Sequence, residues 1–313
     1  MIRQCERPHV HILMCTRNGA RFLEEQLASF LTQSHADWSL WVSDDGSDDA
    51  TLTILEDFRS ANPSRAVHVF SGPGRGSGAN FLSLLGTNGP PAGHVALSDQ
   101  DDVWLPDRLE RALDRLALCR LGAPAIYGGT TIEVRADLTR LPSVRRRRKT
   151  PSFANALIQN TLPGNTILMN PRAYSLVREA ARKAAEVPHH DWWLYALMTG
   201  IGAEITFDDK PTVLYRQHGG NSVGAHRGMG ATLQRFAILA SSRYGGWLRA
   251  NAAALAADGL PLTSENATLL REFRSALDAP APQRLARLGR LGIRRQSGFG
   301  TACIYAATAM GWI

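Results

Sequence analysis

Short apolar runs alternate with longer segments of helical apolar spacing through the first 120 residues of the chain. The runs that predict strands are residues 10–15, 38–42, 67–70 and 94–97, and the segments that predict helices are 21–32, 51–58 and 107–119. Alternation at this spacing is typical of βαβ units, which build a mainly parallel sheet with right-handed crossovers. We therefore expect an α/β protein of Rossmann-like type, with a central sheet flanked by helices.

The pattern changes along the rest of the chain. Further strands are predicted at residues 125–127, 131–134, 164–169, 203–207 and 212–215. Helices are expected to begin at Pro171 and near His189. After residue 230 the predicted helices are 231–241, 247–257, 265–277 with Ser264 as N-cap, and one from Pro282. The sequence thus predicts an α/β domain over residues 1–225 and a helical extension over residues 226–313.

The loops that follow the early strands carry the candidate chemistry. Parallel strands point the same way, so loops 16–20, 43–49, 72–79 and 98–104 should all open on one edge of the sheet. Ligands of open α/β sheets usually bind at that edge. Two of these loops are acidic and two combine glycine with polar residues, which is typical of a nucleotide site.

The acid loop at residues 98–104 has three carboxylates within four positions, on Asp99, Asp101 and Asp102. Carboxylates packed this closely repel one another unless a cation lies between them. A divalent metal with oxygen ligands removes that repulsion, and magnesium would leave positions open for substrate phosphates. The alternative is a solvated acidic turn that caps the helix after Pro106.

The cysteines and the apolar runs of the sequence indicate the cellular compartment and argue against some classes of site. The 313 residues include four scattered cysteines and no CxxC pair, which argues against a zinc site or a disulfide framework and fits a reducing cytoplasm. We see no signal peptide and no run of about 20 apolar residues. The sequence therefore predicts a cytoplasmic protein.

Charge is unevenly distributed, because residues 226–313 hold eleven arginines and no lysine against four acids, while the rest of the chain is neutral. On a helical wheel the five arginines of 283–295 gather on one side and Leu285, Leu288 and Ile293 on the other, with Leu291 falling among the arginines. An uncharged stretch with Trp312 follows. This combination is typical of an interfacial anchor on an anionic membrane surface; the alternative is a helical cap packed on the protein. Outside this tail no basic patch is interleaved with aromatic residues, so we expect no nucleic-acid partner.

Three motifs in order resemble the family 2 glycosyltransferases of the GT-A fold. They are Asp-Asp-Gly-Ser at 44–47, the acids of 99–102, and His-Asp-Trp-Trp at 190–193 ahead of Arg-Gln-His at 216–218. The Thr-Arg-Asn-Gly start after the first strand and the Arg-Gln-His-Gly-Gly-Asn-Ser segment most resemble the rhamnosyltransferase-like members. The resemblance covers about residues 9–224. It departs from the family at Gln100, where small residues are common. The glycine-rich loop at residues 72–79 follows no fixed phosphate-binding pattern.

The resemblance implies roles for the residues of these loops. Asp44 would accept the base N–H of the donor nucleotide, because a carboxylate is only an acceptor and both uracil and thymine present an N3–H; its alternative is an Asx turn. Asp99 would touch the ribose or the metal, and Asp101 would bind the metal. Asp102 would bind the metal directly or hold a neighbouring ligand in place. His218 would lie near the metal or the diphosphate, or else in a surface turn. The other implied donor contacts are Thr16, Asn18, Asn165 and Thr166.

The resemblance also implies that Asp191 is the general base that takes the proton from the acceptor hydroxyl. The competing interpretation is a helix N-cap, and the two roles are compatible. Trp192 and Trp193 would stack on an acceptor sugar, or pack in the core as helical tryptophans more often do.

The sequence thus predicts an inverting glycosyltransferase that uses Mg²⁺ or Mn²⁺ and transfers a sugar from a nucleoside-diphosphate donor to a saccharide or lipid-linked acceptor. The resemblance favours dTDP-L-rhamnose as donor, cell-surface polysaccharide synthesis as the process, and a peripheral place on the inner face of the membrane. A UDP-sugar donor is the nearest alternative. A phosphohydrolase with an Asp-x-Asp motif would require a nucleophilic Asp after the first strand, where Thr16 stands. A third alternative is an inactive sugar- or lipid-binding module.

Overall fold

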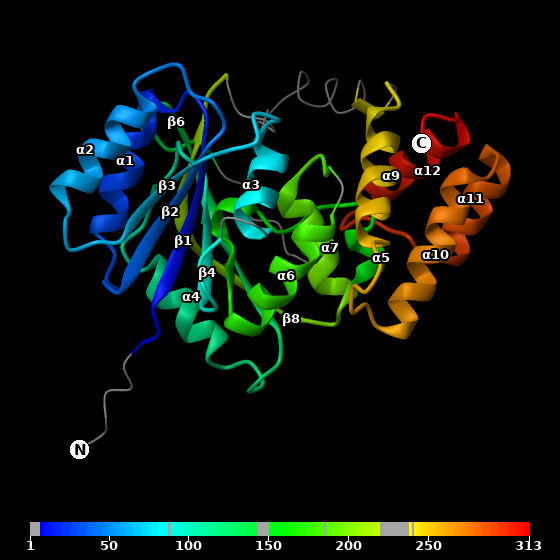
Figure 1. Ribbon diagram of the computed structural model, residues 1–313. Helices are drawn as coiled ribbons and strands as arrows, with labels where there is room; N and C mark the ends of the chain where they lie inside the picture. Colours follow the sequence, from blue (N-terminus) through cyan, green and yellow to red (C-terminus); the bar gives the residue numbers. More distant parts are fainter. Residues whose placement is uncertain (1–6, 87–88, 143–149, 185, 220–237, 240) are drawn as a thin grey trace. The chain divides into compact units, whose positions relative to one another are not determined.

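The computed structural model describes residues 7–86, 89–142, 150–184, 186–219, 238–239 and 241–313 (Figure 1). The chain divides into two compact units. Unit 1 comprises Met1–Ser143, Leu162–Arg182 and Ala203–Arg216, and unit 2 comprises Val144–Thr161, Lys183–Gly202 and Gln217–Ile313. The predicted boundary at residue 225 lies outside the described residues and stays a prediction.

Unit 1 holds an eight-stranded sheet in the order β3-β2-β1-β4-β7-β6-β8-β5. Its strands are β1 (Val10–Thr16), β2 (Trp38–Asp44), β3 (Val67–Ser71), β4 (His94–Ser98), β5 (Val103–Trp104), β6 (Ala125–Arg135), β7 (Leu168–Met169) and β8 (Glu204–Gln217). Its helices are α1 (Ala20–Leu31), α2 (Thr51–Ala61), α3 (Ser77–Gly86), α4 (Arg108–Leu116) and α6 (Pro171–Lys183), with a 3₁₀ turn at Gly164–Thr166. The α/β prediction, with helices flanking a sheet, is therefore confirmed.

The direction of the strands differs between the two halves of this sheet. Strand β1 pairs in parallel with β2 and β4, and β2 pairs in parallel with β3. The pairs β4–β7, β6–β7 and β5–β8 are antiparallel. The βαβ alternation of the first 100 residues thus produces the parallel half, and the shorter segments of the second half add antiparallel strands that the pattern did not predict.

The core of unit 1 explains why the early elements form. Alternate residues of β1, at Val10, Ile12 and Met14, are fully buried on the side that also buries Leu27 and Phe30 of α1. Their neighbours on the other face of β1 are buried as well, as expected for a central parallel strand. Burial of both faces accounts for a continuous apolar run where an edge strand would alternate.

Three sequence predictions for the second half need correction. The predicted strands 125–127 and 131–134 form the single strand β6, and 203–207 and 212–215 form the single strand β8. The candidate strand 164–169 is a 3₁₀ turn followed by the two-residue strand β7. Short polar interruptions were interpreted as loops, although a half-exposed strand tolerates them.

Unit 2 is helical over its described residues. Its helices are α5 (Phe153–Ala156), α7 (His190–Gly200), α9 (Arg243–Leu255), α10 (Ser264–Asp278), α11 (Ala281–Arg290) and α12 (Gly298–Ala309). The N-cap of α10 is Thr263, whose Oγ1 accepts a bond from the Asn266 amide, so the predicted cap at Ser264 is wrong by one residue. Most of the predicted helix 231–241 lies outside the described residues. Within the part of the chain that the structure describes, no helix has the length and apolarity needed to cross a bilayer.

Candidate active site

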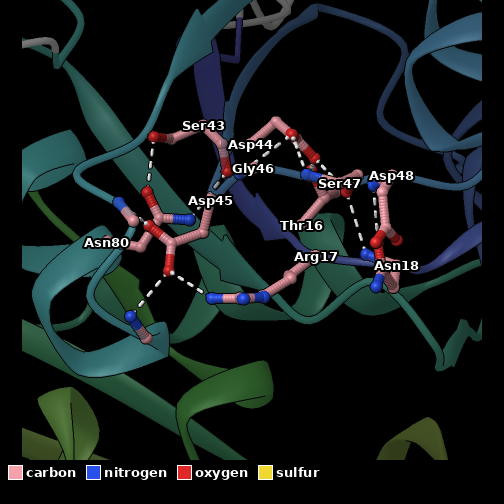
Figure 2. Close-up of polar contacts among 12 residues, drawn as sticks. Thr16, Arg17, Asn18, Ser43, Asp44, Asp45, Gly46, Ser47, Asp48 and Asn80 are labelled. Carbon is pink, nitrogen blue, oxygen red and sulfur yellow. Dashed lines mark hydrogen bonds and ion pairs between the residues drawn. The ribbon is translucent and has the colours of Figure 1, made fainter.

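The loops after β1 and β2 are joined by reciprocal hydrogen bonds at the carboxyl edge of the sheet (Figure 2). Thr16 Oγ1 donates to Asp44 Oδ1 over 2.8 Å. The Asn18 amide donates to Ser47 Oγ, and the Asp48 amide donates to Asn18 Oδ1. Asn18 has φ +48°, a left-handed conformation that asparagine tolerates better than most residues. The predicted donor residues Thr16 and Asn18 therefore hold the two loops together in this structure.

The Asp44 carboxylate is saturated with donors. Besides Thr16 Oγ1, it accepts bonds from the Gly46 amide, the Ser47 amide and Ser47 Oγ, at 2.5 to 3.2 Å. Four donors match the capacity of a carboxylate. The Asx-turn interpretation is thus realised, with Gly46 at φ +85°. The base-binding role of Asp44 stays a prediction, and a nucleobase would have to replace one of these donors.

Asp45 attaches the glycine-rich loop to the end of β2. It is 3% exposed and accepts bonds from the Gly74 amide at 2.7 Å and the Gly76 amide at 2.6 Å. Arg17 Nη1 lies 3.7 Å from the same carboxylate (Figure 2). Both glycines have positive φ, which directs their amides at the acid. Sequence reasoning assigned no role to Asp45, although its place beside Asp44 at a strand end was a usable signal.

The acid loop after β4 contains one buried and two partly exposed carboxylates. Asp99 and Asp101 are partly exposed, whereas Asp102 is fully buried. Asn165 Nδ2 donates to Asp102 Oδ2 over 2.5 Å, and the Arg216 amide donates to its Oδ1 over 3.0 Å. Burial, followed by repulsion from Asp101, raises the pKa of Asp102 to about 7. These contacts favour a role for Asp102 in holding the acid loop in place over a role as a direct metal ligand.

Arg216 of β8 connects the acid loop with two other segments of unit 1, helix α1 and the turn after β6. Its side chain is fully buried, and Nε donates to the Asp101 carbonyl at 2.8 Å. Nη2 contacts Glu25 Oε2 in α1 at 2.6 Å, and Nη1 donates to the Ala136 carbonyl. The guanidinium also lies over the Phe22 ring, 4.5 Å from its centroid. A planar fork of donors suits such divergent contacts, and sequence reasoning missed it because the partners lie far away in the chain.

Gln100 joins the acid loop to the loop after β1. Its Oε1 accepts the Arg17 amide at 2.8 Å and its Nε2 donates to the Arg17 carbonyl at 3.0 Å. A β-carbon at Gly19 would lie 2.4 Å from Gln100 Oε1, so a larger residue at this position would displace the Gln100 side chain. The departure from the family pattern at Gln100 therefore has a structural role.

Arg108 of α4 supports the acid loop from below. It is 1% exposed, and its Nη2 donates to the carbonyls of Leu97 at 2.9 Å and Asn165 at 2.7 Å. Its guanidinium carbon lies 3.4 Å from the centre of the Trp104 ring. The carbonyl contacts fix the end of β4 against the 3₁₀ turn that carries Asn165. Thr166 of the same turn is fully buried and donates to the Pro163 carbonyl.

Three further predicted residues belong to α7 in unit 2. Asp191 is partly exposed in the first turn, behind the N-cap His189, so the N-cap interpretation is wrong. Trp192 is 4% exposed and donates from Nε1 to the Ala156 carbonyl at 2.7 Å, and Trp193 is fully buried. Core packing accounts for both tryptophans, and their acceptor role stays a prediction.

His218 is partly buried, one position after the end of β8. The Asn221 and Ser222 positions of its motif lie outside the described residues. Among the described residues, no cluster of three or more histidine, cysteine or acidic side chains has the geometry of a metal site. Magnesium typically takes only one or two carboxylates and completes its shell with water and substrate phosphates. The two partly exposed carboxylates of the acid loop, on Asp99 and Asp101, therefore fit such an ion as a donor set.

Comparison with known proteins agrees with this arrangement. The dTDP-rhamnosyl transferase RfbG of Shigella flexneri is 29% identical over 245 residues, which is 74% of this chain and 80% of the relative. The structure of TarS from S. aureus with UDP-GlcNAc has a TM-score of 0.58 at 15% identity and covers 97% of this chain and 89% of its own. The mannosyltransferase PcManGT of Pyrobaculum calidifontis with GDP-Man and Mn²⁺ has a TM-score of 0.54 at 17% identity, covering 99% and 82%.

The two structural likenesses show the fold, and they confirm the GT-A architecture expected from the sequence motifs. The profile of the family described as "Glycosyl transferase family 2" matches residues 11–180, more than half of the chain. That range contains the loops joined by Asp44, Asp45 and Gln100, together with the acid loop. The chain therefore belongs to glycosyl transferase family 2.

Proposed function

We propose that this glycosyltransferase is metal-dependent and inverting, with a nucleoside-diphosphate sugar as donor and dTDP-L-rhamnose as the favoured one. The observation that carries the proposal is the acid loop, which keeps Asp99 and Asp101 partly exposed at the carboxyl end of β4. The relative from Shigella flexneri is named a dTDP-rhamnosyl transferase, and the two structural neighbours hold UDP-GlcNAc and GDP-Man. A UDP-sugar donor is the second candidate. Membership of the family sets aside the phosphohydrolase alternative.

Different residues are proposed to bind the cation and to hold the acid loop in place. Asp101 and Asp99 would supply oxygen ligands, His218 is a further candidate ligand, and Asp102 would fix the loop through Asn165 and Arg216. The metal, Mg²⁺ or Mn²⁺, supplies charge neutralisation for the leaving diphosphate. PcManGT, which shares the fold, contains Mn²⁺.

Asp191 is proposed as the general base. An inverting transfer is one in-line displacement, so the acceptor hydroxyl must lose its proton to a positioned base as it attacks. Asp191 lies in the first turn of α7 and is partly exposed, so its carboxylate is accessible to an acceptor. We propose a saccharide or lipid-linked acceptor in cell-surface polysaccharide synthesis, with the enzyme bound peripherally at the membrane.

A thermal-shift screen of nucleotide sugars with Mn²⁺ or Mg²⁺ tests the donor and the metal together. We expect stabilisation by dTDP-L-rhamnose with metal and its loss in EDTA. Asp101→Ala should abolish the metal-dependent part, whereas Asp57→Ala, an exposed acid of α2, should leave it intact. Equal stabilisation with and without metal would overturn the metal proposal, and a response to UDP-sugars alone would select the second donor.

Replacing Asp191 by Asn tests the base. The variant should retain donor binding in calorimetry and lose turnover by a factor of about 10² to 10⁴, which is the usual contribution of a general base. Turnover at the wild-type rate would remove Asp191 from the mechanism.

A further inference from the structure

Most of the apolar side predicted for residues 283–295 is packed within unit 2. Leu288 of α11 and Ile293, which follows the end of this helix at Arg290, are each 1% exposed, whereas Leu285 is partly exposed. The segment is fastened within unit 2, since the Arg294 carbonyl accepts Asn155 Nδ2 and Arg295 Nη1 donates to the Tyr244 hydroxyl. The apolar residues of α11 are therefore used mainly for packing, and an exposed apolar surface for a partner lies elsewhere.

Helix α12 leaves an apolar side exposed. Ile304 and Ala307 of this helix are buried, whereas Phe299 is 75% exposed and Met310, just after its end, is 50% exposed. Ala302 and Ala306 lie exposed between them at helical spacing. Surface helices of globular proteins normally carry charged or polar residues on the outer face, but residues 296–313 contain no charged side chain. An exposed apolar surface of this kind marks an interaction site.

A groove of about 240 Å³ lies along this side of α12. Phe299, Cys303, Met310 and Trp312 are among the residues that line it, with Leu239 from the segment before α9. The lining is almost entirely apolar, and Trp312 contributes an aromatic ring of the type that favours membrane interfaces. The groove adds concave apolar area to the exposed side chains of the helix.

The charge beside α12 identifies the partner. Helices α11 and α12 pack against each other, with the Tyr305 hydroxyl donating to the Ile293 carbonyl (Figure 1). Arg287, Arg290 and Arg294 are exposed along this part of the chain. Residues 279–313 contain five arginines and no acid. A second copy would bring the same positive charge to the contact and would be repelled, whereas an anionic lipid surface complements both the charge and the apolar side.

We propose that the exposed side of α12, flanked by the arginines of α11 and the turn after it, docks on an anionic lipid bilayer. Phe299 and Met310 enter the interface between headgroups and acyl chains, and Arg290 and Arg294 contact lipid phosphates. This inference rests on the proposed function for its purpose, which is to bring the enzyme to a lipid-linked acceptor.

Co-sedimentation of the full chain with vesicles tests the surface. The wild-type protein should bind vesicles of phosphatidylcholine mixed with phosphatidylglycerol more tightly than phosphatidylcholine alone, and salt should weaken the difference. Phe299→Ser and Met310→Ser should each lower the affinity roughly tenfold on the mixed vesicles. Arg290→Gln and Arg294→Gln should each lower it about fivefold, and only where the lipid is anionic.

Matched controls come from unit 1. Leu121 is 106% exposed and Arg59 is an exposed arginine of α2, so Leu121→Ser and Arg59→Gln should bind vesicles as the wild type does. An environment-sensitive fluorophore on Cys303, in a chain carrying Cys5→Ser and Cys119→Ser, should shift to the blue on binding because Cys303 lines the groove.

Three results would overturn the proposal. They are a wild-type chain that stays in the supernatant with both vesicle types, variants of Phe299 and Met310 that sediment as the wild type does, or a wild-type dimer that these variants dissociate. The assay needs no donor or metal, so its outcome is independent of the thermal-shift screen. A chain that binds vesicles but no nucleotide sugar would contradict the proposed function and leave the docking surface in place.

Discussion

At the scale of single residues, the site is built from side chains that each satisfy several backbone groups. Asp45 accepts two amides of the glycine loop, and Gln100 bonds both the amide and the carbonyl of Arg17. Each hydrogen bond of this kind makes a net contribution to folding stability of about 0.5–1.5 kcal/mol, and more where one partner is charged. The loops therefore keep a defined shape before a donor binds.

The close approach of Gly19 to Gln100 predicts that the effects of substituting these two residues on stability are coupled. Gly19→Ala should lower the free energy of unfolding by about 1–2 kcal/mol, because the new β-carbon displaces Gln100 from Arg17. In a Gln100→Ala background the same substitution should cost close to nothing. Urea unfolding of the double-mutant cycle measures this coupling, and additive effects would contradict it.

Arg216 should position the acid loop through its fork of donors. Arg216→Lys keeps the charge but cannot reach Asp101, Ala136 and Glu25 together, so we expect a loss of about 2–4 kcal/mol in stability. Glu25→Gln removes the charge of one partner and should cost about 1 kcal/mol.

Metal binding provides the readout that distinguishes positioning from stability. Titration with Mn²⁺ in the presence of a nucleoside diphosphate should show weaker binding in Glu25→Gln, whereas the exposed neighbour in Glu24→Gln should behave as the wild type. Equal Mn²⁺ affinity in both variants would limit Arg216 to a structural role.

At the scale of elements, burial in the sheet disfavours the charged form of His11. Burial, with repulsion from His9 and His68, lowers the pKa of His11 in β1 from 6.5 to about 4, against a weaker opposing effect of Asp37. Ser39 Oγ lies 2.9 Å from His11 Nδ1, and the Trp41 ring meets the imidazole edge-on. The strand pairing therefore favours an uncharged imidazole at this position.

Stability should consequently decrease as the pH falls from 6.5 towards 4, because the unfolded chain binds a proton that folded His11 does not take up. The contribution is present in full above pH 6.5, and its loss amounts to at most about 3 kcal/mol. In urea unfolding His11→Asn should reduce the slope over this window. Part of the slope should persist because burial also lowers the pKa of His190 to about 4. An unchanged slope would contradict the assignment.

At the scale of the whole molecule, the proposed functional residues are distributed over the two units. The loops that carry the proposed donor contacts after β1, β2 and β4 belong to unit 1, and unit 2 contains Asp191, His218 and the helices α10, α11 and α12. The hydrogen bonds among the unit 1 loops form a continuous network from Ser47 to Gln100. Donor binding should therefore act first on unit 1.

Hydrogen exchange with mass spectrometry checks this division. With donor and Mn²⁺ present, peptides that cover residues 43–49, 72–79 and 98–104 should exchange more slowly, and those covering 264–309 should remain unchanged. Anionic vesicles should produce the reverse, with protection centred on α12. Donor-induced protection of α12 would show that the two surfaces are coupled.

The sequence alone determined the βαβ order of the first hundred residues, the shared edge of their loops and the acid loop, because apolar periodicity and strand direction are local properties. The tertiary structure decided which partner each polar group meets. Asp102 is bound by Asn165 and Arg216, 63 and 114 positions away, and Leu288 of α11 is covered while Phe299 of α12 is exposed. Helical spacing shows that a face is apolar, but only the packing of distant segments decides whether that face is covered.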